Sequence, residues 1–180
     1  FIKAICEELA KKDRYKDILT EEYIMEIFET APLHDIGKVG VPDYILLKPG
    51  KLTPEEYEKM KLHVNYGVNA IMADSYLSIP SFIKTAVEII GGHHEQYNGN
   101  GYPKGLKGEE IPLAARLMAF ADVYDALINK RIYKEAFTHE VAMNMILERS
   151  GTQFDPEIVE AFVACEDRII AIAAQYKAQE

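Results

Sequence analysis

The chain has 180 residues, of which 48% are hydrophobic and 27% are charged, and its formal net charge is −9. This composition indicates a domain with a full core and a solvated surface. The chain contains no run of about 18 apolar residues, which is the length that a membrane crossing needs. The acidic balance and the lack of a basic stripe argue against a scaffold for nucleic acid polymers, but bound divalent cations would still allow a small anionic substrate. Cys6 and Cys165 lie far apart in helical patterns, so we expect free, buried thiols and a cytoplasmic location.

The N-terminal part of the chain predicts two helices. Phe1 to about Lys12 carries half an apolar stripe with no N-cap before it, as at the end of a helix that begins earlier. Thr20 can cap a second helix, which we expect to run past Pro32, at a cost, and to deliver His34 and Asp35 to the core. The expected inward face of that helix consists of Ile24, Ile27, Phe28 and Ala31.

A loop through Pro42 and Gly50, with little regular structure expected, leads to a third helix. Its start is clear, because Thr53-Pro54-Glu55-Glu56 combines a threonine cap, proline at the first helical position and glutamate three residues after the cap. The core side of this helix is expected to contain Met60, Val64, Gly67, Val68 and Ile71. His63 lies one turn from two of these residues, so it too can point inward.

A fourth helix is predicted from about Ser81 to Glu95. Its apolar stripe consists of Phe82, Ile83, Ala86, Val87 and Ile90. His93 and His94 continue that stripe at the C-terminal end, where the helix dipole favours a cation. The segment Asn98 to Pro103 has turn chemistry, and it is expected to hold Tyr102 out on a loop.

The C-terminal part of the chain predicts three more helices, from Leu113 to about Ile128, from about Thr138 to Ser150, and from Pro156 to about Gln175. Asp122 lies among small and apolar residues in the first of these, and a buried carboxylate needs a partner, for which a metal ion is the simplest candidate. We expect His139 to be solvated. The expected packing stripe of the last helix consists of Ile158, Val159, Phe162, Val163, Ile169 and Ile170. No β-hairpin signal stands out, so the fold class is predicted to be all-α.

Six inward-facing side chains form a mixed imidazole and carboxylate set. They are His34, Asp35, His63, His93, His94 and Asp122. Such a set suits Fe, Mn, Ni or Zn better than Ca or Mg, and six ligands fit two ions that share a carboxylate, with Asp35 as the natural bridge. Two ions roughly 3.5–4 Å apart could hold a hydroxide and bind a phosphodiester. Lys38 could neutralise the same phosphate, and Arg131 and Lys134 would add positive charge.

The chain resembles the HD-GYP domain family from near Phe1 to about Phe162. The motifs that carry the resemblance are His34-Asp35-Ile36-Gly37-Lys38, Lys48-Pro49-Gly50-Lys51-Leu52, His63, His93-His94-Glu95, Gly101-Tyr102-Pro103, Asp122-Val123-Tyr124-Asp125-Ala126-Leu127, Arg131, Tyr133-Lys134 and Phe154-Asp155-Pro156. The resemblance implies an HD-domain helical bundle with a metal site in its core. It also implies a phosphodiesterase that hydrolyses the bacterial messenger cyclic di-GMP to linear pGpG, to GMP or to both, through a metal-bridging hydroxide.

The resemblance also implies roles for individual residues. The implied ligands of one metal are His34, Asp35 and Asp122, and those of the other are Asp35, His63, His93 and His94. Lys38 and Asp35 are the implied catalytic residues. Arg131, Lys134 and Tyr102 are the implied substrate-binding residues. The Gly101-Tyr102-Pro103 loop is associated in the family with substrate access and with the docking of diguanylate cyclase domains.

The chain departs from the family pattern at its start, because the family uses one more histidine that would precede Phe1. We therefore expect residues 1–180 to form a single HD-GYP domain without its first helix and any upstream sensor or receiver domain. The first metal site would then be a ligand short or completed by water. Two alternatives stay open: a catalytically weak module that senses nucleotide or docks a protein, and an HD hydrolase acting on another nucleotide.

Overall fold

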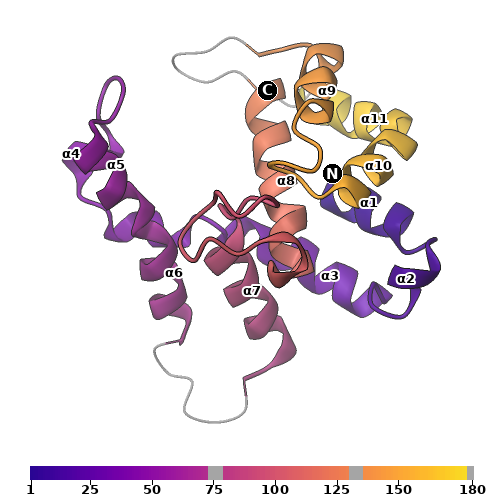
Figure 1. The fold of residues 1–180 in the computed structure, drawn as a ribbon, viewed down its shortest axis with the longest axis horizontal. Coiled ribbons are helices and arrows are strands. Elements are labelled where there is room, and N and C mark those ends of the chain that lie inside the picture. Colours follow the sequence, from indigo (N-terminus) through magenta and orange to yellow (C-terminus); the bar gives the residue numbers. More distant parts are fainter. Residues whose placement is uncertain (73–78, 130–135, 178–180) are drawn as a thin grey trace.

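The computed structural model describes residues 1–72, 79–129 and 136–177, and the regular structure within these ranges is helical (Figure 1). The α-helices are α1 (Ile2–Leu9), α2 (Asp13–Lys16), α3 (Glu21–Thr30), α4 (Asp43–Leu46), α5 (Pro54–Lys61), α6 (His63–Met72), α7 (Ser81–Gly92), α8 (Leu113–Ile128), α9 (His139–Leu147), α10 (Pro156–Ala164) and α11 (Glu166–Lys177), and the 3₁₀ helices are η1 (Ala31–Leu33), η2 (Ile36–Gly40) and η3 (Gly108–Glu110). Extended pairing in the described ranges is confined to isolated bridges. The prediction of an all-α protein is confirmed.

Helix α8 lies between two groups of helices (Figure 1). On one side are α1, α9, α10 and α11, and on the other α4, α5 and α6 extend away as an arm. Helix α7 joins the two groups, because it contacts α3, α6 and α8. The core follows α8, where Phe120 is fully buried and its ring centroid lies 5.4 Å from that of Phe154 and 4.9 Å from that of Phe162.

The predicted helix starts are confirmed where a side chain caps the helix. The Thr20 hydroxyl accepts a hydrogen bond from the Tyr23 amide at 3.2 Å. Thr53 and Glu56 form a complete capping box, because each side chain accepts a hydrogen bond from the backbone amide of the other residue. These local contacts satisfy amides that have no partner inside their helix.

Several predicted helix boundaries are wrong. Helix α3 ends at Thr30, and Pro32 lies in the 3₁₀ turn η1, because proline lacks the amide that would continue the α-helical hydrogen bonding. The third predicted helix is broken at Leu62 into α5 and α6, and the last one is broken at Cys165 into α10 and α11. The loop through Pro42 contains the one-turn helix α4.

Four residues of the expected apolar faces are exposed. The exposed fractions are 50% for Phe28, 36% for Phe82, 42% for Val163 and 43% for Ile170. Phe28, Val163 and Ile170 each follow a buried residue, so the stripe that contacts neighbouring helices is narrower than the stripe of apolar residues in the sequence. Phe28 lines a cavity of about 750 Å³ that reaches from Phe1 to His34 and Asp122.

Both cysteines are free and buried, as predicted. Burial raises the pKa of the Cys6 thiol to about 12. Among the described residues, no helix combines the length and the apolarity that a membrane crossing would require.

Candidate metal centre

The first two predicted ligands lie in a tight turn against α6. His34 and Asp35 connect η1 to η2, and His63 is the first residue of α6. The two backbones approach so closely that a Cβ on Gly37 would lie 1.9 Å from the carbonyl oxygen of His63 and 2.4 Å from the amide nitrogen of Gly67. Only glycine fits at this contact, and the contact holds the His-Asp pair beside the α6 histidine.

The other predicted ligands come from α7 and α8. Helix α7 ends at Gly92, earlier than predicted, so that His93 and His94 follow its last turn rather than lie within it. A Cβ on Gly92 would lie 2.8 Å from the Cβ of Ala115, so the glycine lets α7 approach α8. Asp122, two turns further along α8, faces the same space.

The structure brings four of the predicted ligands into one cluster. Ligand atoms from Asp35, His63, His93 and His94 all lie within 4.8 Å of one another. The Oδ1 atom of Asp35 is 3.5 Å from Nε2 of His63 and 3.8 Å from Nε2 of His93. The side chains of these two histidines are almost completely buried, whereas that of Asp35 is 31% exposed.

The hydrogen bonds of the histidines fix which ring nitrogen faces the cluster. Each Nδ1 lies against a backbone carbonyl oxygen, at 2.8 Å for His34 and Ala31, 2.7 Å for His63 and Met60, and 3.0 Å for His93 and Ile90. A carbonyl oxygen can only accept a hydrogen bond, so each of these Nδ1 atoms must carry the proton and donate. In a neutral ring, Nε2 then carries a free lone pair. The Nε2 atoms of His63 and His93 face each other at 3.5 Å. Two facing lone pairs beside a carboxylate repel one another unless a proton or a metal ion lies between them, and imidazole nitrogens together with a carboxylate oxygen are a donor set that fits a divalent metal ion.

His34 and Asp122 lie at the edge of this cluster. Nε2 of His34 is 3.3 Å from Oδ2 of Asp35 and 3.9 Å from Oδ1 of Asp122. The two carboxyl oxygens of Asp35 therefore face different histidines, with Oδ1 toward the buried pair and Oδ2 toward His34. This arrangement suits a carboxylate shared between two neighbouring sites.

The electrostatics keep Asp35 ionised. Burial alone would raise the pKa of the Asp35 carboxyl. The neighbouring His34, His93 and Lys38 outweigh burial and hold that pKa well below its usual range. Burial, together with the charges that His93 and His63 would carry, lowers the pKa of His94 to about 3. The cluster thus contains an anionic oxygen and at least one imidazole that stays neutral, which is the state that binds metal.

Lys38 lies at the solvent side of the cluster. Its ammonium contacts Oδ2 of Asp35 at 2.5 Å, and its side chain is 41% exposed. A cation in this position can reach an anion that approaches Asp35 from solvent.

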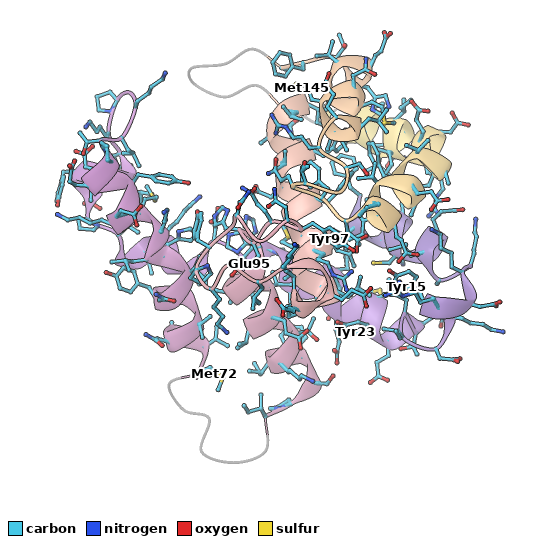
Figure 2. All side chains as sticks on the ribbon, viewed as in Figure 1. Tyr15, Tyr23, Met72, Glu95, Tyr97 and Met145 are labelled. Carbon is cyan, nitrogen blue, oxygen red and sulfur yellow. The ribbon has the colours of Figure 1, made fainter. Side chains whose placement is uncertain are left out.

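The loop after α7 folds around a buried glutamate for which no role was predicted. Glu95 is 2% exposed, and its carboxylate accepts hydrogen bonds from the amides of Lys104 and Leu106, at 2.8 and 3.1 Å. A Cβ on Gly101 would lie 2.4 Å from the Cα of Glu95. Glu95 lies near the middle of the molecule (Figure 2). It therefore shapes the Gly-Tyr-Pro segment rather than taking part in the cluster.

The expectation that Tyr102 is held out on the loop is wrong. Its ring stacks on that of His94, with centroids 4.7 Å apart and planes 26° apart, and the Tyr102 amide donates to the His94 carbonyl at 3.2 Å. The Tyr102–Pro103 peptide bond is cis. Tyr102 thus forms part of the wall of the metal centre, and burial followed by the nearby Tyr57 raises the pKa of its hydroxyl.

Two further expectations concern residues after Asp122. Arg131 and Lys134 lie outside the described residues. His139 was expected to be solvated, but its Nδ1 lies 2.7 Å from the Tyr124 hydroxyl and its Nε2 lies 3.0 Å from Oε1 of Glu166. The prediction that His139 is solvated is wrong, because α9 and α11 bring these partners together from distant parts of the sequence.

A comparison with protein-family models matches residues 2–158 to the model described as HD domain. The chain belongs to the HD domain family. Among curated proteins, it is 52% identical to a protein of Vibrio cholerae serotype O1 named cyclic di-GMP phosphodiesterase, over 98% of this chain and 36% of that protein. It is 41% identical to a protein of the same name from Thermotoga maritima, over 90% of this chain and 43% of that protein.

Another relative of this HD domain is named for a different substrate. A Vibrio cholerae protein named 3′3′-cGAMP-specific phosphodiesterase 2 is 42% identical over 87% of this chain and 29% of its own length. The chain spans less than half the length of each of these relatives. A crystal structure of a cyclic GMP-AMP specific phosphodiesterase of V. cholerae matches with a TM-score of 0.55 at 20% identity, over 93% of this chain and 43% of that one. That match supports the fold.

Proposed function

We propose that this HD domain is the hydrolase module of a phosphodiesterase that cleaves cyclic di-GMP to linear pGpG, to GMP or to both. The observation that carries the proposal is the convergence of Asp35, His63, His93 and His94 within 4.8 Å. It occurs in a chain 52% identical to a relative named cyclic di-GMP phosphodiesterase.

The donor set supports a pair of divalent ions, of which Fe or Mn suits the mixture of imidazole and carboxylate best, with Ni or Zn as further candidates. We propose that one ion takes His34, Asp35 and Asp122. The other would take Asp35, His63, His93 and His94. When bound, such ions acidify water and neutralise phosphate oxygens.

The protein's own side chains would orient the substrate. Asp35 faces both histidine groups, so its carboxylate sets the spacing between the two sites. Lys38 would exchange part of its contact with Asp35 for an oxygen of the scissile phosphate and stabilise the charge that develops there. Tyr102, packed on His94, would close one side of the site and exclude water. Arg131 and Lys134 are retained as proposed contacts to the dinucleotide.

The rest of the Gly-Tyr-Pro loop offers a surface for a partner. Asn100, Pro103 and Lys104 are exposed, while Tyr102 is turned toward the metal centre. We also propose that diguanylate cyclase domains dock on this exposed edge. The free state of both cysteines supports a reducing, cytoplasmic environment.

The test is hydrolysis of cyclic di-GMP by protein loaded with Mn²⁺ or, without oxygen, with Fe²⁺, with products separated by chromatography. We expect pGpG or GMP from the parent protein. His93→Ala and Asp35→Ala should each lower the rate by more than about 100-fold. Removing a metal ligand costs more than removing a residue that only hydrogen-bonds to a ligand. His139→Gln is the matched control, and it should stay within about twofold of the parent.

Full activity in both ligand variants would contradict the proposal, and so would a metal-loaded parent that binds cyclic di-GMP without forming product. The name of the 42% identical relative makes 3′3′-cGAMP a second candidate substrate. Comparing kcat/KM for the two dinucleotides decides between them.

A further inference from the structure

A lysine at the rim of the metal centre is held between two tyrosine rings. The ammonium nitrogen of Lys61 lies 5.0 Å from the ring centroid of Tyr57 and 5.3 Å from that of Tyr102. The two rings meet edge to face, with centroids 6.4 Å apart. The Lys61 side chain is only 27% exposed, so the ammonium is partly shielded from solvent.

This corner adjoins the proposed catalytic site. Tyr102, one of the two rings that hold Lys61, stacks directly on His94 of the four-residue cluster. Lys61 ends α5, and His63 begins α6 immediately after the Leu62 bend. The rim cation and the cluster are therefore joined both through Tyr102 and along the chain.

The anion that now pairs with Lys61 is easily exchanged. Glu58 contacts its ammonium at 2.7 Å, but the Glu58 side chain is 68% exposed. Ion pairs at such exposed positions contribute little, because water and salt compete for both partners. A phosphate that arrived from the substrate side could replace Glu58 at small cost.

On the basis of the proposed function, we propose that Lys61 binds the phosphate of the cyclic dinucleotide that is not being cleaved. Such a substrate carries two phosphodiesters, and the metal cluster with Lys38 can neutralise only the one that reacts. The second negative charge enters a protein of net charge −9, and Lys61 would add a cation to the proposed dinucleotide contacts of Arg131 and Lys134. A fixed ammonium at the rim offsets that charge and sets the orientation of the dinucleotide.

The surroundings of Lys61 favour a phosphate over a base. The ring of Tyr102 is already engaged by His94 and by Lys61, so this corner presents a positive charge rather than a bare aromatic face for stacking. An ammonium is a compact point charge suited to phosphate oxygens. A phosphate contact would serve every cyclic dinucleotide equally, whereas a contact to guanine O6 would discriminate against adenine.

The experiment compares Lys61→Met with the parent on three substrates: cyclic di-GMP, 3′3′-cGAMP and bis(p-nitrophenyl) phosphate, which has one phosphodiester only. We expect kcat/KM for both cyclic dinucleotides to fall by about tenfold or more, mainly through KM, because a hydrogen bond to a charged group is lost. Hydrolysis of bis(p-nitrophenyl) phosphate should stay within about twofold. Lys61→Arg should restore most of the loss.

Lys59→Met is the control, because Lys59 belongs to the same helix but contacts Tyr44, away from the cluster. Equal losses on all three substrates, no loss on any, or a loss confined to cyclic di-GMP would each overturn the assignment. If the parent cleaves bis(p-nitrophenyl) phosphate but neither dinucleotide, the proposed function fails. Calorimetric titration of cyclic di-GMP into the parent and Lys61→Met then tests the lysine by itself, and equal affinities, or no binding to the parent, would overturn its role.

Discussion

Two histidine environments in this protein differ in how the ring nitrogens are paired. In the metal centre, His63 and His93 use Nδ1 on backbone carbonyls, and their Nε2 atoms face each other at 3.5 Å with no donor between them. In the C-terminal helices, both nitrogens of His139 lie within hydrogen-bonding distance of polar side chains, the Tyr124 hydroxyl and the Glu166 carboxylate. The first arrangement is incomplete without a cation, and the second is closed.

The difference shows which histidines can serve chemistry. A closed network stabilises the fold, because every polar group in it has a partner. Lone pairs converging on an anionic oxygen are unfavourable, and that cost is offset when a proton or a metal ion binds between them. Burial alone does not separate the two cases, since both kinds of histidine lie largely inside the protein. The two kinds of histidine differ in whether an imidazole lone pair points at a cluster of other ligand atoms.

The strongest way to break this comparison is to separate the backbones that hold the metal centre together. Gly37→Ala would place a methyl group 1.9 Å from the His63 carbonyl oxygen, so η2 and α6 would have to move apart. We expect the free energy of unfolding to fall by about 3 kcal/mol or more, because this contact is between two backbones that cannot rotate away. Urea denaturation measures the change, and metal content should fall with it.

Gly91→Ala is the matched control for that variant. A Cβ there would meet only a methyl group of Val68, at an ordinary 3.5 Å, and alanine favours the helix. It should leave stability unchanged or raise it by up to about 1 kcal/mol. Equal stability of the two variants would show that the approach of η2 to α6 is not as tight as described.

Metal binding is expected to stabilise the protein through the cluster of Asp35, His63, His93 and His94, and not through the network around His139. A divalent ion at 100 times its Kd should stabilise the protein by about 2.7 kcal/mol, or raise Tm by about 5–10 °C for a chain of this size. Thermal unfolding with Mn²⁺ and with a chelator measures this shift. His93→Ala should lose it, whereas His139→Gln should keep it. The same shift in both variants would mean that the ion binds elsewhere.

The sequence predicted the features that depend on neighbours along the chain. The caps at Thr20 and Thr53 are local hydrogen bonds, and helical periodicity was enough to place His63 and His93 on buried faces. That reading recovered the all-α class and the side chains that converge on Asp35.

Features set by contacts between distant segments could not be predicted in the same way. The bend at Leu62 and the stacking of Tyr102 on His94 depend on how helices pack, which no local pattern encodes. Glu95 was part of a quoted motif, but its role was not predicted, because its partners are backbone amides of its own loop and amides leave no signal in the residue sequence. His139 was misjudged for a related reason, since Glu166 comes from another helix.

The smallest expected effect comes from removing one hydrogen-bond partner of His139 while the four-residue cluster stays unchanged. Tyr124→Phe removes the hydroxyl that lies 2.7 Å from Nδ1 of His139 and keeps the buried ring. We expect a loss of about 1 kcal/mol in the free energy of unfolding, because one hydrogen bond is removed and a partly buried nitrogen is left with less support. Adding His139→Gln should then cost less than it does in the parent, since both changes act on one network. Urea denaturation of the two single variants and the double variant measures this coupling, with metal content as the second readout. Strict additivity would show that the two side chains act separately, and a loss of metal in Tyr124→Phe would show that α8 transmits the change to Asp122.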